Sequence, residues 1–174
     1  MSARILVAGI GNIFLGDDAF GVEVAQRLER HSQPPGVSVV DYGIRGFDLA
    51  FALCDDYDAA ILVDATQRGE APGTLYVLEI DADTELGGPA VETHNINPHV
   101  VLSLVKMLGG QPHDLYLVGC EPGQLGLEED GHLGLSAPVE AAIDEAVRMV
   151  EALIGNLLAA GRQIVQPAES EART

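Results

Sequence analysis

Apolar residues along the chain fall into short runs that polar, glycine- and proline-containing stretches separate. Apolar runs of four to six residues predict β-strands, here at 5–8, 37–40, 59–63, 75–80 and 115–118. Apolar residues at helical spacing predict helices at 20–30, 46–54, 98–108 and from 137, after a Ser136 cap, to about 158. Strands that alternate with helices predict a three-layer α/β/α domain around a mostly parallel, twisted, five-stranded sheet.

The connection between the third and fourth predicted strands is too short for a crossover helix. It runs from Thr66 to Gly73 and is polar. We therefore expect the strand at 75–80 to run antiparallel to its neighbours. The chain shows no internal repeat, and its length suits one core, so residues 1–160 are expected to form one domain. The polar residues 161–174 are expected to form a disordered tail.

The net charge of the chain argues against two classes of binding partner. It carries 27 acidic and 9 basic residues, a formal net charge of −18, which disfavours binding to nucleic acid or to an anionic membrane. Its two cysteines form no disulfide framework, and Met1 to Arg4 lead directly into a core strand without a signal peptide. No apolar run reaches the length of a membrane span. We therefore expect a reduced, cytoplasmic protein and a monomer.

Carboxylates occupy the loop in which many α/β proteins bind phosphate. The first predicted strand breaks at a glycine turn and leads to Asp17 and Asp18, and carboxylates attract metal ions and repel phosphate. Asp64 ends the third predicted strand, and His94 precedes the helix at 98–108. If the first and third strands are neighbours, Asp18, Asp64 and His94 share one crevice at the carboxyl edge of the sheet. This trio predicts a site for a divalent transition metal with open positions.

Each member of the trio has a simpler interpretation. Asp17 or Asp18 can serve as a helix N-cap, Asp64 can turn the chain after its strand, and His99 is a rival for His94. The dinucleotide fingerprint lacks its third glycine, which Phe14 replaces, and Asp41 is the only candidate for a ribose contact. No nucleophile elbow or P-loop lysine is present. We interpret Cys120 as a buried small residue.

Five segments, in order, resemble the hydrogenase maturation endopeptidases. The most specific is GIGNIFLGDDAFGV at 9–22, which matches the opening signature of that family. Supporting matches are DYGIRG at 41–46, LVDA at 62–65, THN at 93–95 and VGCEP at 118–122. The resemblance covers nearly the whole domain. It implies an endopeptidase that removes the C-terminal extension of a nickel–iron hydrogenase large subunit.

The resemblance also assigns roles to residues. The metal-contacting trio of the family falls on Asp18, Asp64 and His94, and the metal they read is nickel inside the substrate rather than a tightly held cofactor. The second-strand stretch is linked to substrate choice, which implies recognition by Asp41, Gly43 and Gly46. The chain departs from the family pattern by carrying Asp18 where Glu is common, and also at Tyr42, Ile44, Asn95 and His99.

The chemical step and the function class both have alternatives. The metal could polarise the scissile carbonyl or activate water, or a carboxylate could act as a general base in the manner of an aspartyl protease. A different class is a metal-dependent recognition module that binds the same large subunit without cutting it. A third is a Rossmann-like, nucleotide-binding enzyme.

Overall fold

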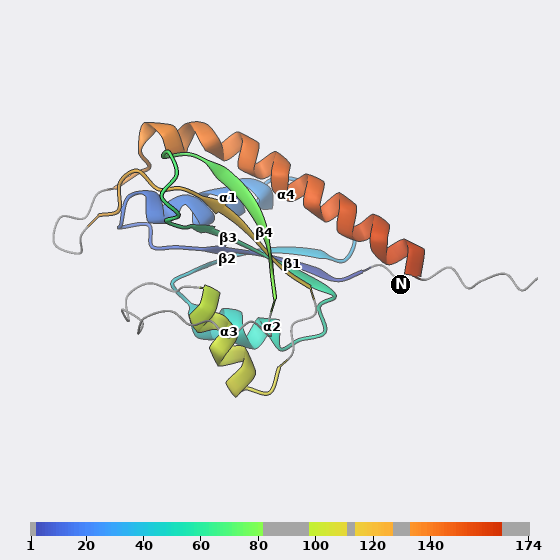
Figure 1. Ribbon diagram of the computed structural model, residues 1–174. Coiled ribbons are helices and arrows are strands. Elements are labelled where there is room, and N and C mark those ends of the chain that lie inside the picture. The colour runs from blue at the N-terminus through green and yellow to red at the C-terminus, as the bar shows by residue number, and fades with distance from the viewer. Residues whose placement is uncertain (1–2, 82–97, 111–113, 127–132, 165–174) are drawn as a thin grey trace, which may run out of the picture.

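A computed structural model describes residues 3–81, 98–110, 114–126 and 133–164 (Figure 1). The strands are β1 (Ile5–Ile10), β2 (Val37–Gly43), β3 (Ala59–Ala65), β4 (Leu75–Ile80) and β5 (Asp114–Cys120). The helices are a 3₁₀ turn, η1 (Asp17–Ala19), and α1 (Phe20–Glu29), α2 (Gly46–Leu53), α3 (Pro98–Met107) and α4 (Ala137–Ile164).

The strands form one sheet in the order β2-β1-β3-β5-β4. β1 pairs in parallel with β2 and β3, and β3 pairs in parallel with β5. β4 runs antiparallel to β5, as its short connection predicted. The predicted fold class is confirmed. Because β1 and β3 are parallel neighbours, their carboxyl ends lie at the same edge of the sheet, which is the condition on which the predicted site depends.

Helices cover both faces of the sheet. Figure 1 shows α1 and α4 on one face and α2 and α3 on the other. Successive residues of a strand point to opposite faces, so Ile5 and Val7 pack with α1 and α4, whereas Leu6 and Ala8 pack with α2 and α3. Every residue of β1 is buried, which explains its uninterrupted apolar sequence.

The last helix is longer than its sequence pattern predicted. α4 continues to Ile164, past the expected end near 158 and into the expected tail at 161–174. Leu158 is still buried, and a Cβ added to Gly161 would lie 3.2 Å from that of Ala3. The helix therefore stays packed beside the start of the sheet, and packing extends it beyond the clear apolar stripe. The rest of the predicted tail lies outside the described residues.

No helix in the described part of the chain has both the length and the apolar character that crossing a membrane requires.

Candidate active site

The start of α1 lies very close to the central strands because glycines meet there. A Cβ on Gly21 would lie 2.0 Å from the carbonyl oxygen of Val63 and 2.3 Å from that of Ile10. A Cβ on Gly9 would lie 2.4 Å from the carbonyl oxygen of Gly21. Side chains at either position would force the helix away from the sheet. This contact holds η1, which directly precedes α1, against the end of β3.

The structure brings Asp18 and Asp64 together, as their positions in the sequence predicted. Asp64 is the penultimate residue of β3 and is only 6% exposed, and Asp18 is half-buried in η1. Burial and the negative charge of Asp18 hold the pKa of Asp64 well above its usual value, against the hydrogen bond from the Ala65 N–H. Burial also raises the pKa of Asp18, although its Oδ2 accepts a 2.8 Å hydrogen bond from the Asn12 N–H.

This carboxylate pair can bind a positive ion. Two acids that share a desolvated site repel each other when both are ionised, and a cation between them removes that repulsion. Carboxylate oxygens with an imidazole suit divalent transition metals. His94, the third predicted ligand, lies outside the described residues, and the described residues alone hold no cluster of three such ligands. The rival His99 is the second residue of α3 and is exposed.

Asp17 has a different environment from its neighbour Asp18. It is fully buried, and its carboxylate accepts hydrogen bonds from the N–H groups of Gly123 (2.7 Å), Gln124 (2.7 Å) and Ser136 (2.6 Å) and from the Ser136 hydroxyl (2.8 Å). Burial by itself would raise the pKa of Asp17, but these hydrogen bonds outweigh it and place the pKa below its usual value. Asp17 is therefore a buried, ionised acceptor.

Asp17 joins three segments that are distant in sequence. Its N–H donates to the Gln124 carbonyl oxygen at 2.8 Å, and Gly16 forms a β-bridge with Leu125 beside it. The loop before α1 is thereby tied to the loop after β5 and to the start of α4. Ser136 precedes α4 as predicted, and its carbonyl oxygen accepts from Glu140 at 2.9 Å, but its hydroxyl binds Asp17 rather than the helix.

The N-cap interpretation of the two aspartates is wrong. Neither η1 nor α1 has a side-chain cap hydrogen bond, and the residues at the two cap positions are Gly16 and Ala19. The carboxylate of Asp17 reaches across to the β5 loop, and that of Asp18 turns back to Asn12. The sequence carries no local signal for the role of Asp17, because its donors lie more than 100 residues away.

A third buried carboxylate, Glu121, holds the loop that follows β3. It is 5% exposed and accepts hydrogen bonds from the N–H groups of Arg68 (2.7 Å) and Gly69 (3.3 Å). The preceding residue, Cys120, is buried as predicted. Burial, with the charges of Asp17 and Glu121, raises the pKa of its thiol to about 12. Cys120 is therefore a protonated core residue and not a nucleophile.

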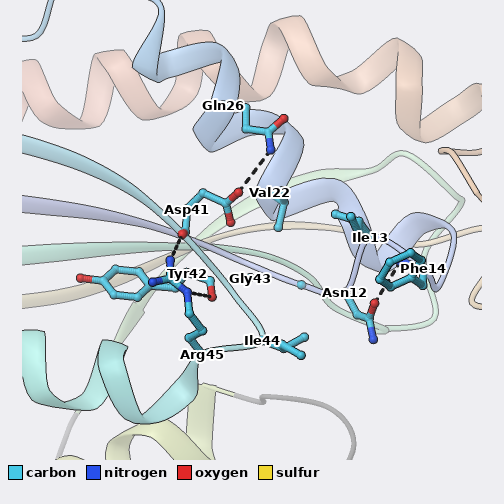
Figure 2. Close-up of a pocket in the computed structure, with 11 residues that line it drawn as sticks. Asn12, Ile13, Phe14, Val22, Gln26, Asp41, Tyr42, Gly43, Ile44 and Arg45 are labelled. Atoms are coloured by element: carbon cyan, nitrogen blue, oxygen red, sulfur yellow. Dashed lines mark hydrogen bonds between the residues drawn. The ribbon is translucent and has the colours of Figure 1, made fainter.

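A cleft of about 360 Å³ opens between the β1–η1 loop and the β2–α2 loop (Figure 2). Two of the residues predicted for substrate recognition, Asp41 and Gly43, line it, whereas Gly46 begins α2. Asp41 Oδ2 accepts a 3.2 Å hydrogen bond from Gln26 Nε2. Asn12 also lines the cleft and donates to Asp18, so the two sites share one loop.

The side chain of Arg45 is held by hydrogen bonds to the backbone of its own loop. Its guanidinium donates to the carbonyl oxygens of Asp41 and Tyr42 and lies 5.6 Å from the centre of the Tyr42 ring. It also lies 3.6 Å from Asp48. Sequence reasoning did not single out this residue, which shapes the cleft wall between Asp41 and α2.

Comparison with known proteins identifies the family of the chain. A profile described as hydrogenase maturation protease matches residues 22–153, well over half of the chain. The chain belongs to the hydrogenase maturation protease family. The hydrogenase 2 maturation protease of Escherichia coli K12 is 38% identical over 158 residues, 87% of this chain and 90% of that protein. HupM, a hydrogenase expression/formation protein of Azotobacter chroococcum, is 35% identical over 88% of this chain and 72% of its own.

Solved structures of maturation proteases share the fold. A hydrogenase maturating endopeptidase from E. coli superposes with a TM-score of 0.70 at 37% identity. The match covers 88% of this chain and 93% of the E. coli chain. A nickel–iron hydrogenase maturation protease from Thermococcus kodakarensis gives 0.65 at 31% identity, over 88% and 92%. The predicted reaction class, a hydrolase of the endopeptidase type, is therefore confirmed. The comparisons do not favour the nucleotide-binding or the non-cleaving alternative.

Proposed function

We propose that this protease removes the C-terminal extension of a nickel–iron hydrogenase large subunit once nickel has been inserted. Family membership supports the reaction class and the hydrogenase substrate. The single observation that carries the nickel dependence is the carboxylate pair Asp18 and Asp64, which share a desolvated edge of the sheet. A site of this kind gains most from a ligand that brings positive charge.

In this proposal the nickel belongs to the substrate, and the protease recognises the substrate by binding that nickel. Asp18, Asp64 and His94 supply oxygen and nitrogen ligands, which suit Ni²⁺. The cleft beside them, with Asp41 and Gly43, receives polypeptide near the scissile bond, and Gly46 sets the start of α2 at its wall. Three loop ligands at an open edge leave positions for substrate atoms, so the protease alone should hold metal weakly.

Two routes for the chemical step use these same residues. In one, the nickel polarises the scissile carbonyl or lowers the pKa of an attacking water molecule. In the other, a carboxylate takes the proton from that water, as in an aspartyl protease. The raised pKa of Asp64 supports a part for this residue as a base, because a base works best when its pKa approaches the operating pH.

We also propose that the protease works as a monomer in the cytoplasm. Both cysteines are free, Cys54 at the surface and Cys120 in the core, which suits a reducing compartment. The charge of −18 opposes close association of two copies.

Cleavage of purified precursor with and without nickel tests the proposal. The nickel-loaded precursor should be cut, and the nickel-free precursor should remain uncut even at high protease concentration, because the two carboxylates then have no positive partner. Loading nickel into the same sample should restore cutting. Efficient cleavage of nickel-free precursor would overturn the nickel dependence. Tightly held, stoichiometric nickel or zinc in the purified protease would assign the metal to the enzyme instead.

A further inference from the structure

Two large apolar side chains that line the cleft, and two more on the helix α2 that follows one cleft wall, are more than half exposed. Their exposed fractions are 61% for Phe14, 64% for Ile44, 66% for Phe47 and 58% for Phe51. We call these four residues the apolar rim. Single exposed apolar residues are ordinary on protein surfaces, but a gathering of large ones marks an interaction site. Three aromatic rings in it strengthen this reading, because aromatic residues are enriched in binding interfaces.

The apolar rim follows from the geometry of α2. Phe47 and Phe51 are four residues apart, so they share one face of the helix, and Ile44 precedes that face by three residues. Leu49 and Leu53 point from α2 into the core and already supply its packing. The packing of α2 on the core therefore does not require Phe47 or Phe51.

Two residues of the apolar rim line the cleft. Ile44 lines it on the β2–α2 side, and Phe14 lines it from the β1–η1 loop (Figure 2). The loop that carries Phe14 also carries Asn12, which binds Asp18. A protein that covers the apolar rim would thus lie directly beside the carboxylate pair.

Charges around the apolar rim indicate what covers it. Asp48 lies between Phe47 and Phe51 in sequence and is 59% exposed, and Asp55 and Asp56 are exposed just beyond α2. The nearby cation, Arg45, is already bound to Asp48 and to its own backbone. Two copies of this chain would set acid against acid. An apolar surface bordered by Lys or Arg would instead complement the rim and its acidic surround.

We propose that the apolar rim is a docking surface for the folded body of the large-subunit precursor, at an apolar patch bordered by basic residues. This inference rests on the proposed function and adds a contact that involves neither the nickel nor the cleaved tail itself. Aromatic side chains on the rim act as anchors, and the surrounding acids speed encounter.

The test uses a nickel-loaded large subunit that already ends at the mature C-terminus, so that no cleavage occurs during the measurement. Biolayer interferometry gives its Kd for the wild-type chain and for the double variant F47S/F51S. Loss of two anchors should weaken binding at least about tenfold. The control is Val77→Thr, an exposed position on β4 at the opposite edge of the sheet, and it should bind like wild type. Phe14→Ser, on the other cleft wall, provides an independent variant.

Each outcome separates the docking surface from the proposed function. Unchanged Kd in both folded rim variants would overturn the docking surface, while cutting of the precursor by wild type would leave the proposed function intact. Binding that the rim variants weaken, with no cutting of the nickel-loaded precursor by wild type, would support the docking surface and overturn the proposed function. Self-association of wild type that F47S/F51S abolishes, with the Kd for the subunit unchanged, would assign the rim to a second copy and overturn the proposal.

Discussion

Asp17 and Asp18 are adjacent and chemically identical, yet the fold gives them opposite properties. Asp17 is the more deeply buried of the two, and its pKa lies below the usual value because four donors surround it. Asp18 accepts one backbone hydrogen bond, and its pKa lies above the usual value. Burial alone therefore does not decide the charge state of a carboxyl group. Hydrogen-bond donors and neighbouring charges decide it together with burial.

A contrast in hydrogen bonding also separates the carboxylates at the ends of two neighbouring strands. Glu121, after β5, accepts two backbone N–H groups and holds a loop, whereas Asp64, near the end of β3, has the charge of Asp18 as its neighbour. One edge of the sheet thus carries two carboxylates that stabilise loops and two for which we propose a role in the reaction. The hydrogen bonds of Asp17 also fix the turn that carries Asp18, because the two residues are adjacent in the chain.

Replacing Asp64 by Asn should separate function from stability most clearly. Loss of the charge should reduce cleavage of nickel-loaded precursor more than about 100-fold, within the range for loss of a catalytic acid or base. The melting temperature should stay the same or rise, because a strained buried acid is removed. Asp18→Asn should behave alike. An assay of cleavage per folded molecule, with calorimetry, checks this, and a stability collapse with normal activity would reassign Asp64 to the scaffold.

His94 should matter more than His99. His94→Ala should abolish processing, because the trio loses its imidazole, while His99→Ala should cost little. Initial rates on nickel-loaded precursor measure both, with wild type as the reference. The reverse ranking would make the imidazole at the start of α3 the partner of Asp18 and Asp64, and equal losses would indicate a site with two histidines.

Asp17→Asn should show the opposite pattern to Asp18→Asn. An amide offers one acceptor oxygen to four donors and turns its own NH₂ toward some of them, which should lower the free energy of unfolding by roughly 3 kcal/mol. Urea titration measures this loss. Cleavage per folded molecule should stay within about tenfold of wild type. If Asp17→Asn kept the stability of the wild type but lost cleavage, Asp17 would take part in the chemical step. The contrast between Asp17 and Asp18 would then not hold.

The pH dependence of stability should show the smallest effect. Asp64 has a folded-state pKa above its unfolded value, so the folded chain binds the extra proton between those two values. Stability from this group is complete below the ordinary pKa of an aspartate and is lost as pH rises through the raised one. The Asp64→Asn variant has no such proton to lose. The difference in free energy of unfolding between this variant and the wild type should therefore grow as pH rises from the ordinary pKa of an aspartate to the raised pKa of Asp64. Urea titrations from pH 4 upward check the sign, and a difference that shrinks with rising pH would contradict it.

The local sequence pattern was sufficient to predict most of the fold and the proximity of two residues of the predicted trio. Apolar runs and turn residues predicted the strands and helices, and the short link after Thr66 predicted the antiparallel β4. Asp18 and Asp64 were predicted to meet because both follow parallel strands that are neighbours. The end of α4 was missed, since its last turns depend on packing beside Ala3 rather than on their own apolar pattern.

The amino-acid pattern was enough to predict the family, the layer architecture and the edge of the sheet at which carboxylates gather. The environment of each carboxylate, in contrast, follows from contacts between distant parts of the chain. The donors to Asp17 come from Gly123, Gln124 and Ser136, and no spacing rule connects residues so far apart. Exposure of the apolar rim is likewise a tertiary property, because Phe47 and Leu49 are both apolar residues of one helix and only the position of the core distinguishes them. Local chemistry selects the elements, and long-range contacts then assign each side chain its environment.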